Sequence, residues 1–235
     1  MQTQKIAIDG PAGAGKSTIA KAVAEELGFV YIDTGAMYRA IGLGAVRRKV
    51  NTTDAEAVEA ILDDLAVTIR HSENGQLIYL NGEDVSQAIR MPEISVAASN
   101  VAVIPAVRLK LVELQRNLAE ETNVIMDGRD IGTYVLPDAQ LKIFLTASPE
   151  ARAQRRFSEL KEKGVETTYE EVFRDMEFRD RNDSGREFAP LKPAEDSILI
   201  DSTDLSLAET VEKIAKLAKA MRKSLEERSG EDGVL

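Results

Sequence analysis

The stretch IAIDGPAGAGKSTIAKAVAEELG, residues 6–28, determines the expected fold. Residues 6–9 are apolar up to a closing Asp and predict a short buried strand. Residues 10–17 match the pattern G-x-x-x-x-G-K-[ST]. Apolar residues then recur at helical spacing, and Gly28 supplies a stop. A strand, a glycine-rich loop and a helix in this order predict a phosphate-binding loop, or P-loop.

The residues of this loop explain how it would hold a phosphate. Its glycines let the backbone curl so that consecutive N–H groups face an anion, and the helix that follows directs its positive end there. Lys16 can reach the β- and γ-phosphates, and the Ser17 hydroxyl can ligate Mg²⁺. We therefore expect ATP and Mg²⁺ at this loop. The expected nucleotide-binding residues are Gly10, Pro11, Ala12, Gly13, Ala14, Gly15, Lys16, Ser17 and Thr18.

The composition limits the class of protein. The 235 residues, 43% of them hydrophobic, suffice for one large α/β domain or for a core with an inserted subdomain. A net charge of −10 argues against a broad electrostatic grip on nucleic acid or on an anionic membrane. With no cysteine and one histidine, thiol catalysis and histidine metal clusters are excluded. Without a signal segment or a long apolar run, the chain is expected to be soluble and cytoplasmic.

Five short apolar runs predict the strands of one sheet. Their apolar residues are nearly continuous, as burial on both faces requires. Four of the five end in Asp, and the carboxyl ends of parallel strands line the crevice where ligands bind. Helical segments separate them, so we expect a doubly wound, five-stranded parallel sheet with helices on both faces. The runs are residues 5–9, 29–33, 123–127, 141–145 and 197–201.

Residues 65–100 interrupt this alternation. Two Asn-Gly pairs, at 74–75 and 81–82, separate stretches with period-two apolar residues, which predicts a small antiparallel β insertion. His71 is expected on its surface, without a chemical role. The expected organisation is a P-loop core (1–64, 101–147 and 187–222), the insertion (65–100), a helical lid (148–186) and a frayed tail (223–235).

Three capping patterns predict where the later helices begin. Ser148 followed by Pro suits an N-cap and a first turn. Thr168 with Glu171, and Ser206 with Glu209, have capping-box spacing.

The chain lacks the usual signatures of water as the phosphate acceptor. It has no Asn-Lys-x-Asp motif of the kind that reads guanine, and Asp127 is followed by Gly rather than by the Glu usual in motor and transport ATPases. Arginines suited to a bidentate grip on phosphate lie beyond strand ends and in residues 148–186. Any one of them could be a solvated surface charge. As a set they favour a small-molecule kinase.

Four motifs together resemble the bacterial cytidylate kinase family, among the P-loop nucleoside monophosphate kinases. The resemblance extends from Lys5 to about Met221, and the last three motifs carry its specificity because many kinases share the loop. It implies transfer of phosphate from ATP to CMP or dCMP with Mg²⁺. The motifs are DGPAGAGKST (9–18), YIDTGAMYR (31–39), DGRDIGT (127–133) and RNDSGREFAPL (181–191).

The resemblance also implies roles for individual residues. Thr34 would contact the cytosine, and Arg108 and Asp130 would read the base. A carboxylate can accept from the cytosine 4-amino group, whereas uracil presents a carbonyl there. Asp183 and Arg186 would contact the sugar and the acceptor.

The resemblance assigns the phosphate contacts to arginines. Arg39 and Arg129 would hold the acceptor phosphate. Closure of the lid would bring Arg155 and Arg179 toward the transferring group. The catalytic residues implied are Lys16, Arg129, Arg155 and Arg179.

Simpler interpretations remain open for several of these residues. Asp130 could pair with its neighbour Arg129, Thr34 could only cap a helix, and Asp183 could be a solvated acid. Asp127 could order Mg²⁺ through water or only end its strand. Two other functions also remain open: a kinase of the same fold acting on AMP, dTMP, shikimate or dephospho-CoA, and a binding factor that hydrolyses ATP slowly. All groups needed lie on one chain, so we expect a monomer.

Overall fold

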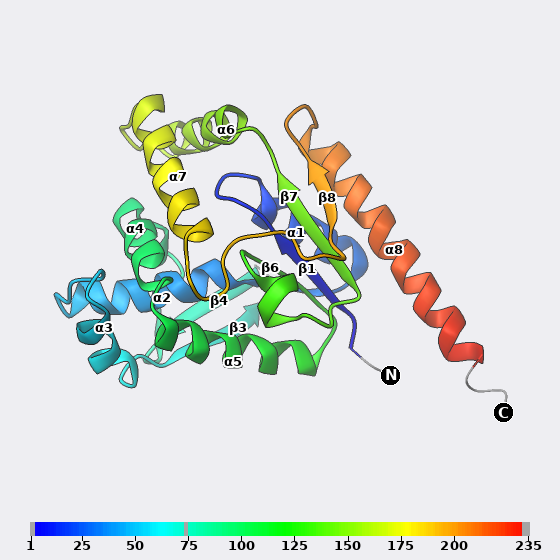
Figure 1. Ribbon diagram of the computed structural model, residues 1–235, viewed down its shortest axis with the longest axis horizontal. Helices are drawn as coiled ribbons and strands as arrows, with labels where there is room; N and C mark the ends of the chain where they lie inside the picture. Colours follow the sequence, from blue (N-terminus) through cyan, green and yellow to red (C-terminus); the bar gives the residue numbers. More distant parts are fainter. Residues whose placement is uncertain (1–2, 73–74, 232–235) are drawn as a thin grey trace.

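The computed structural model describes residues 3–72 and 75–231 and contains the expected parallel sheet (Figure 1). All five strands are parallel, in the order β2-β6-β1-β7-β8. The predicted strands are confirmed, with ends that differ by one residue at most. They are β1 (Lys5–Asp9), β2 (Val30–Asp33), β6 (Val124–Gly128), β7 (Leu141–Thr146) and β8 (Ile198–Asp201).

The two faces of the sheet bury separate cores, as a doubly wound fold requires. One core packs α1 (Lys16–Leu27) and α8 (Leu207–Glu231) against the sheet. The other packs α2 (Thr34–Arg47) and α5 (Pro105–Glu121) on the opposite face.

The predicted antiparallel sheet lies between α2 and α5. Its strands are β3 (Val67–Ser72), β4 (Gly75–Leu80) and β5 (Glu83–Asp84), in that order. Asn81 and Gly82 form the second predicted turn, with φ of 52° and 84°. The other predicted turn, at residues 74–75, falls partly on residues that lie outside the described ones. Helices α3 (Ala55–Leu62), η1 (Ala88–Arg90) and α4 (Pro92–Val101) flank these strands.

The insertion is packed against the rest of the molecule. Val67 and Ile78 belong to the same core as α2 and α5. His71 is exposed on β3, as expected. The division of the chain into the four predicted parts stays a prediction.

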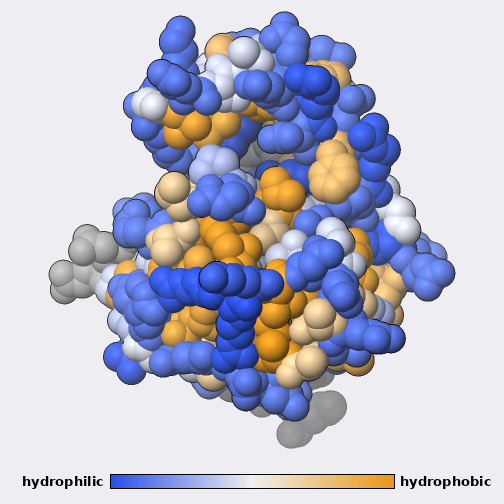
Figure 2. Space-filling view, turned by 90° about the vertical axis from the view of Figure 1, so that its left-hand side faces the viewer, coloured by the Kyte–Doolittle hydropathy of each residue, from blue (hydrophilic) through white to orange (hydrophobic). Residues whose placement is uncertain are grey.

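Helices α6 (Pro149–Glu162) and α7 (Tyr169–Ser184) form the region predicted as a lid, above the sheet in Figure 1. The predicted caps are confirmed: the Ser148 hydroxyl accepts from Ala151 N–H, and Thr168 and Glu171 form a capping box. A small core of Ala153, Val172 and Met176 joins the two helices. In Figure 2 this lobe is mostly hydrophilic above a body with larger hydrophobic patches.

Helix α8 extends farther than expected. Its predicted start is confirmed, since Ser206 and Glu209 exchange capping hydrogen bonds. The segment expected to fray from residue 223 is helical as far as Glu231. Ion pairs between residues four apart, Arg222–Glu226 and Lys223–Glu227, favour this extension.

Within residues 3–72 and 75–231, no single helix is long and apolar enough to cross a membrane. Helices α4 and α5 meet that criterion only together, and the pair is bent by 101°.

Candidate active site

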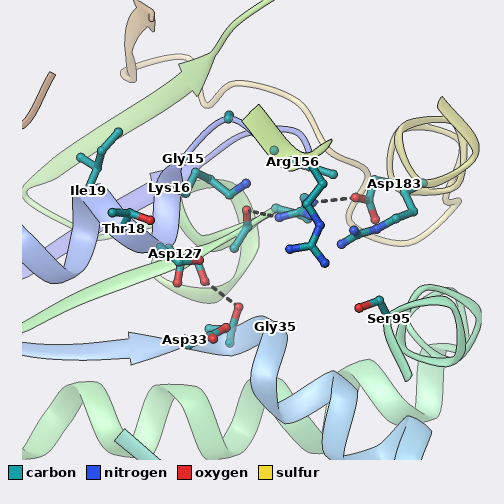
Figure 3. A pocket seen from close by; sticks show the side chains of 18 of the residues that line it. Gly15, Lys16, Thr18, Ile19, Asp33, Gly35, Ser95, Asp127, Arg156 and Asp183 are labelled. Carbon is teal, nitrogen blue, oxygen red and sulfur yellow. Dashed lines mark hydrogen bonds and ion pairs between the residues drawn. The ribbon is translucent and has the colours of Figure 1, made fainter. Parts of the chain in front are cut away.

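A pocket of about 620 Å³ opens at the carboxyl ends of the strands. The P-loop forms one wall, and the ends of β2 and β6 form its floor. Residues of α4, α6 and α7 close the opposite side. Figure 3 shows Lys16 and Asp127 on one side of this space, and Arg156, Asp183 and Ser95 on the other.

At the start of the P-loop, the backbone passes very close to β7. Gly10 has φ of +151°, and a Cβ added there would lie 1.9 Å from the Leu145 carbonyl oxygen. Only glycine therefore fits at the point where β1 turns into the loop. The loop ends at Lys16, the first residue of α1, so the N-terminus of that helix faces the pocket.

The Lys16 side chain is buried without an acidic partner among the described residues. Its ammonium group donates to the Pro11 carbonyl at 2.7 Å and forms no ion pair in the part of the chain that the structure describes. Burial, reinforced by the nearby charge of Arg129, lowers the pKa of Lys16 to about 7. A bound polyphosphate would supply the missing negative charge.

Ser17 and Asp127 place oxygen atoms together beneath the loop. The Ser17 hydroxyl donates to Asp127 Oδ2 at 2.8 Å, and Tyr31 donates to Oδ1 at 2.9 Å. Burial and the charge of Asp33 raise the pKa of Asp127 to about 6. Hydroxyl and carboxylate oxygens are ligands that Mg²⁺ prefers. Among the described residues no cluster of three or more acidic or histidine side chains could hold a metal, so a metal here would also need oxygens from a nucleotide or water.

The start of α2 lies beside this oxygen pair. Thr34 faces the pocket, and its hydroxyl donates to the Asp127 carbonyl at 2.7 Å. The suggestion that Thr34 caps α2 is wrong, because Asp33 is the N-cap and accepts from Ala36 N–H.

Asp33 also holds Arg39 at the pocket wall. Its carboxylate pairs with Arg39 at 2.9 Å and with Arg90 at 3.2 Å. Burial alone would raise the pKa of Asp33, but the two guanidinium groups outweigh it and lower the pKa.

Arg108 and Asp130 form a buried pair. Arg108 is fully buried on α5, donates to Asp130 at 2.5 Å and lies within 5.8 Å of the ring centres of Tyr38 and Phe188. Asp130 lines the pocket with Arg108 behind it, so only one of the two predicted base readers reaches the pocket wall. The alternative pairing of Asp130 with its neighbour Arg129 is wrong.

A second feature fixes the backbone that carries Asp130. The short π-helical turn η2 (Ile131–Val135) follows it directly. Asp9, the last residue of β1, accepts from Ile131 N–H at 2.8 Å and from Gly132 N–H at 2.7 Å. Burial raises the pKa of Asp9 to about 7 despite these hydrogen bonds.

Asp183 joins two of the predicted arginines. Arg129 donates to it at 2.6 Å, and Arg186 approaches it at 3.4 Å. Burial alone would raise the pKa of Asp183, but Arg129 and Arg186 more than compensate and lower it. The alternative of a solvated acid at this position is therefore wrong, since Asp183 is 8% exposed.

The lid arginines differ in where they lie. Arg179 lines the pocket without a hydrogen bond or ion pair to any described residue, and burial together with Arg129 lowers its pKa to about 10. Arg155 also lines the pocket, but it donates to the hydroxyl and the carbonyl of Ser202, just after β8. Arg156, which the sequence argument did not select, extends into the pocket (Figure 3). It pairs with Glu159.

The pocket also contains residues that the sequence analysis left without a role. Asp33 had a signal, because it ends a predicted strand. Ser99 and Ser202 had none, since an isolated serine in a helix or loop has no distinctive pattern.

The comparisons with known proteins agree on one family. The profile of the family described as cytidylate kinase matches residues 6–220. A protein named cytidylate kinase from Caldicellulosiruptor saccharolyticus is 54% identical over 92% of this chain and 96% of its own length. Its namesake from Caldanaerobacter subterraneus subsp. tengcongensis is 55% identical over 90% and 93%. A crystal structure of an uncharacterized protein from Eubacterium ventriosum covers 92% of this chain and 98% of its own at 14% identity, with a TM-score of 0.51, and shows likeness of fold alone.

Proposed function

The chain belongs to the cytidylate kinase family, and from this premise we propose that it transfers the γ-phosphoryl group of ATP to CMP or dCMP. The products are ADP and CDP or dCDP. The observation that carries the proposal is that one pocket is lined by an anion-binding loop, by the Asp130 carboxylate and by several arginines.

The donor nucleotide binds at the P-loop. Backbone N–H groups of the loop and the N-terminus of α1 hold its β- and γ-phosphates. Lys16 takes up a proton and becomes the counter-ion of these phosphates, a role supported by its burial without an acidic partner.

The residues beneath the loop fit a Mg²⁺ ion brought in with ATP. Ser17 would ligate it and Asp127 would order it through water, because their oxygens lie together and a divalent cation would favour the ionised carboxylate. Bound there, the ion would neutralise charge on the phosphates.

The acceptor lies on the opposite side of the pocket. Asp130 accepts from the cytosine 4-amino group, and the Thr34 hydroxyl contacts the same base. Arg39 and Arg129 grip the acceptor phosphate. Asp183, held by Arg129 and Arg186, accepts from a sugar hydroxyl.

The transfer is a direct in-line displacement. An oxygen of the acceptor phosphate forms a bond to the γ-phosphorus as the bond from that phosphorus to the β–γ bridging oxygen breaks. No general base is required, because the acceptor dianion is already a nucleophile. Lys16, Arg129 and Arg179 stabilise charge on the migrating group, and we keep Arg155 as a predicted contributor on lid closure. With every group on one chain, the enzyme acts as a cytoplasmic monomer.

A coupled assay of ADP release tests this function. Mg-ATP is supplied with CMP, dCMP, UMP, AMP, GMP or dTMP in separate reactions. We expect strong turnover with CMP and dCMP, weak turnover with UMP and none with the others. Preference for another monophosphate would overturn the acceptor assignment, and no stimulation by any of them would favour the slow ATP-dependent binding factor.

A further inference from the structure

Arg152 and Asp180 contact the backbone of the P-loop at Ala12, near the start of the loop. Arg152, near the start of α6, donates to the Ala12 carbonyl at 2.9 Å. Asp180, near the end of α7, accepts from Ala12 N–H at 3.3 Å. The two side chains are paired at 2.6 Å. Both polar backbone groups of one loop residue are thus held by a single ion pair.

The pair is well placed to be persistent. The Arg152 side chain is 7% exposed and that of Asp180 is 24% exposed. Arg152 also donates to the Ala147 carbonyl, just after β7. Its guanidinium therefore links the sheet, the loop and α7 at one point. A partly buried, multiply bonded ion pair restricts geometry more than a solvent-exposed pair does.

The surroundings show that α7 is seated directly on the loop. Gly13 has φ of +73°, and a Cβ added there would lie 2.6 Å from Met176 Cε and 3.1 Å from the Arg152 carbonyl oxygen. Met176 and Asp180 are four residues apart and share one face of α7. This face contacts the P-loop.

The adjacent face of the same helix belongs to the pocket. Arg179 and Asp183, again four residues apart, line it, and Asp183 binds Arg129. Because a helix is rigid over one turn, fixing Asp180 on the loop also fixes the direction of Arg179 and Asp183.

We propose that Arg152 and Asp180 form a clamp on Ala12 that holds α7 against the P-loop and so aligns Arg179 with the transferring phosphoryl group. Both are positioning residues, because neither needs to touch a nucleotide. The clamp makes the geometry of the donor loop and that of the acceptor side interdependent. Misplacement of catalytic groups by about 1 Å can cost about 100-fold in rate.

The test compares Asp180→Ala and Asp180→Asn with Asp175→Asn, a control at an exposed position of α7. Rates are measured well below each melting temperature and are normalised to the folded fraction. We expect Asp180→Ala to lower kcat by about 10- to 100-fold while KM for ATP and for CMP changes by less than about threefold. Asp180→Asn keeps one acceptor and should lose less, and the control should match the wild type.

A second variant and a second measurement distinguish a loss of positioning from a general loss of protein stability. In Arg152→Lys, the lysine side chain cannot reach all three partners of Arg152, which are Ala12, Ala147 and Asp180. Combined with Asp180→Ala, this substitution should lower kcat by less than about a further twofold, compared with Asp180→Ala alone. Amide hydrogen exchange in the ligand-free protein should be faster at Ala12 in Asp180→Ala. A kcat within twofold of wild type for Asp180→Ala, or a loss that tracks the unfolded fraction, overturns the proposal. If Asp180→Ala does not fold, the same criteria apply to Asp180→Asn.

Discussion

The basic side chains at the two ends of the pocket are neutralised in different ways. At the donor end, Lys16 is buried without an acidic partner among the described residues, and the loop presents backbone N–H groups. At the acceptor end, the arginines are already paired: Arg39 with Asp33, Arg108 with Asp130, and Arg129 with Asp183. The donor end therefore gains its counter-charge from the ligand, whereas the acceptor end is preorganised by its own carboxylates.

This difference has a consequence for recognition. An unpaired cation attracts any polyphosphate and gives affinity with little selectivity. A paired carboxylate at a fixed position can distinguish a donor from an acceptor on the incoming base. Selectivity is therefore expected at the acceptor end and phosphate affinity at the donor end.

The largest effect is expected from Lys16→Ala. Removal of the counter-ion of the transferring phosphates should lower kcat/KM with CMP by at least about 1,000-fold. The fold should persist, because the variant removes a desolvated charge without leaving an acidic partner unpaired. Circular dichroism and the coupled assay check both parts, and unfolding of the variant would contradict the second.

Asp130→Ala should show the next largest effect, on stability. Arg108 would be left fully buried without its counter-ion, which costs about 3–5 kcal/mol in the free energy of unfolding. Urea denaturation measures this loss. Thr133→Ala, a nearby position outside the pair, serves as a control; equal losses in the two variants would show that the ion pair contributes nothing specific.

Arg179→Met should lower kcat by about 10- to 100-fold and leave stability unchanged or slightly higher. Arg179 has no ion pair to lose within the part of the chain that the structure describes, and the substitution removes a charge that repels Arg129. Arg181→Met, on the exposed part of the same helix, is the matched control. Steady-state kinetics and thermal denaturation compare the two variants. If kcat of Arg179→Met equals that of the control, Arg179 is not a catalytic residue.

The smallest expected effect is proton uptake on ATP binding. The pKa of Lys16 is lowered from 10.5 to about 7 in the ligand-free protein, so Lys16 is mostly neutral at pH 8. Bound phosphates raise this pKa again, and about one proton should be taken up at pH 8 and almost none at pH 6. Titration calorimetry in two buffers of different ionisation enthalpy measures the uptake.

The lowered pKa of Lys16 also determines how this group makes the free energy of unfolding depend on pH. Between pH 7 and pH 10.5 the unfolded chain holds the Lys16 proton more tightly than the folded one, so this group makes the free energy of unfolding rise with pH. Lys16→Met should abolish both this contribution and the proton uptake. Uptake that persists in the variant would assign the proton to another group.

The donor end could be predicted from sequence because its parts are local. Nine consecutive residues supply the loop, and the strand and helix beside it follow from apolar spacing. The five strands were found for the same reason, since strands buried on both faces have nearly continuous apolar runs.

The acceptor end depends on pairings between distant residues. Residue types suggested Arg108 and Asp130, but only the packing of α5 beneath η2 shows that Arg108 lies behind Asp130. The same limit applies to Asp183, which neighbouring charges made look solvated until the fold brought Arg129 to it. The clamp on Ala12 had no signal, because Arg152 and Asp180 each lie in a charge-rich helix.

The most direct test is the preference for CMP over UMP in the wild type and in Asp130→Asn, measured as a ratio of kcat/KM values beside the dissociation constant for ATP. The amide keeps the shape of the side chain and can donate to a carbonyl. We predict that the ratio falls by at least about tenfold while ATP affinity changes by less than about threefold. An unchanged ratio would contradict the assignment of base recognition to Asp130 and, with it, the separation of affinity and selectivity between the two ends.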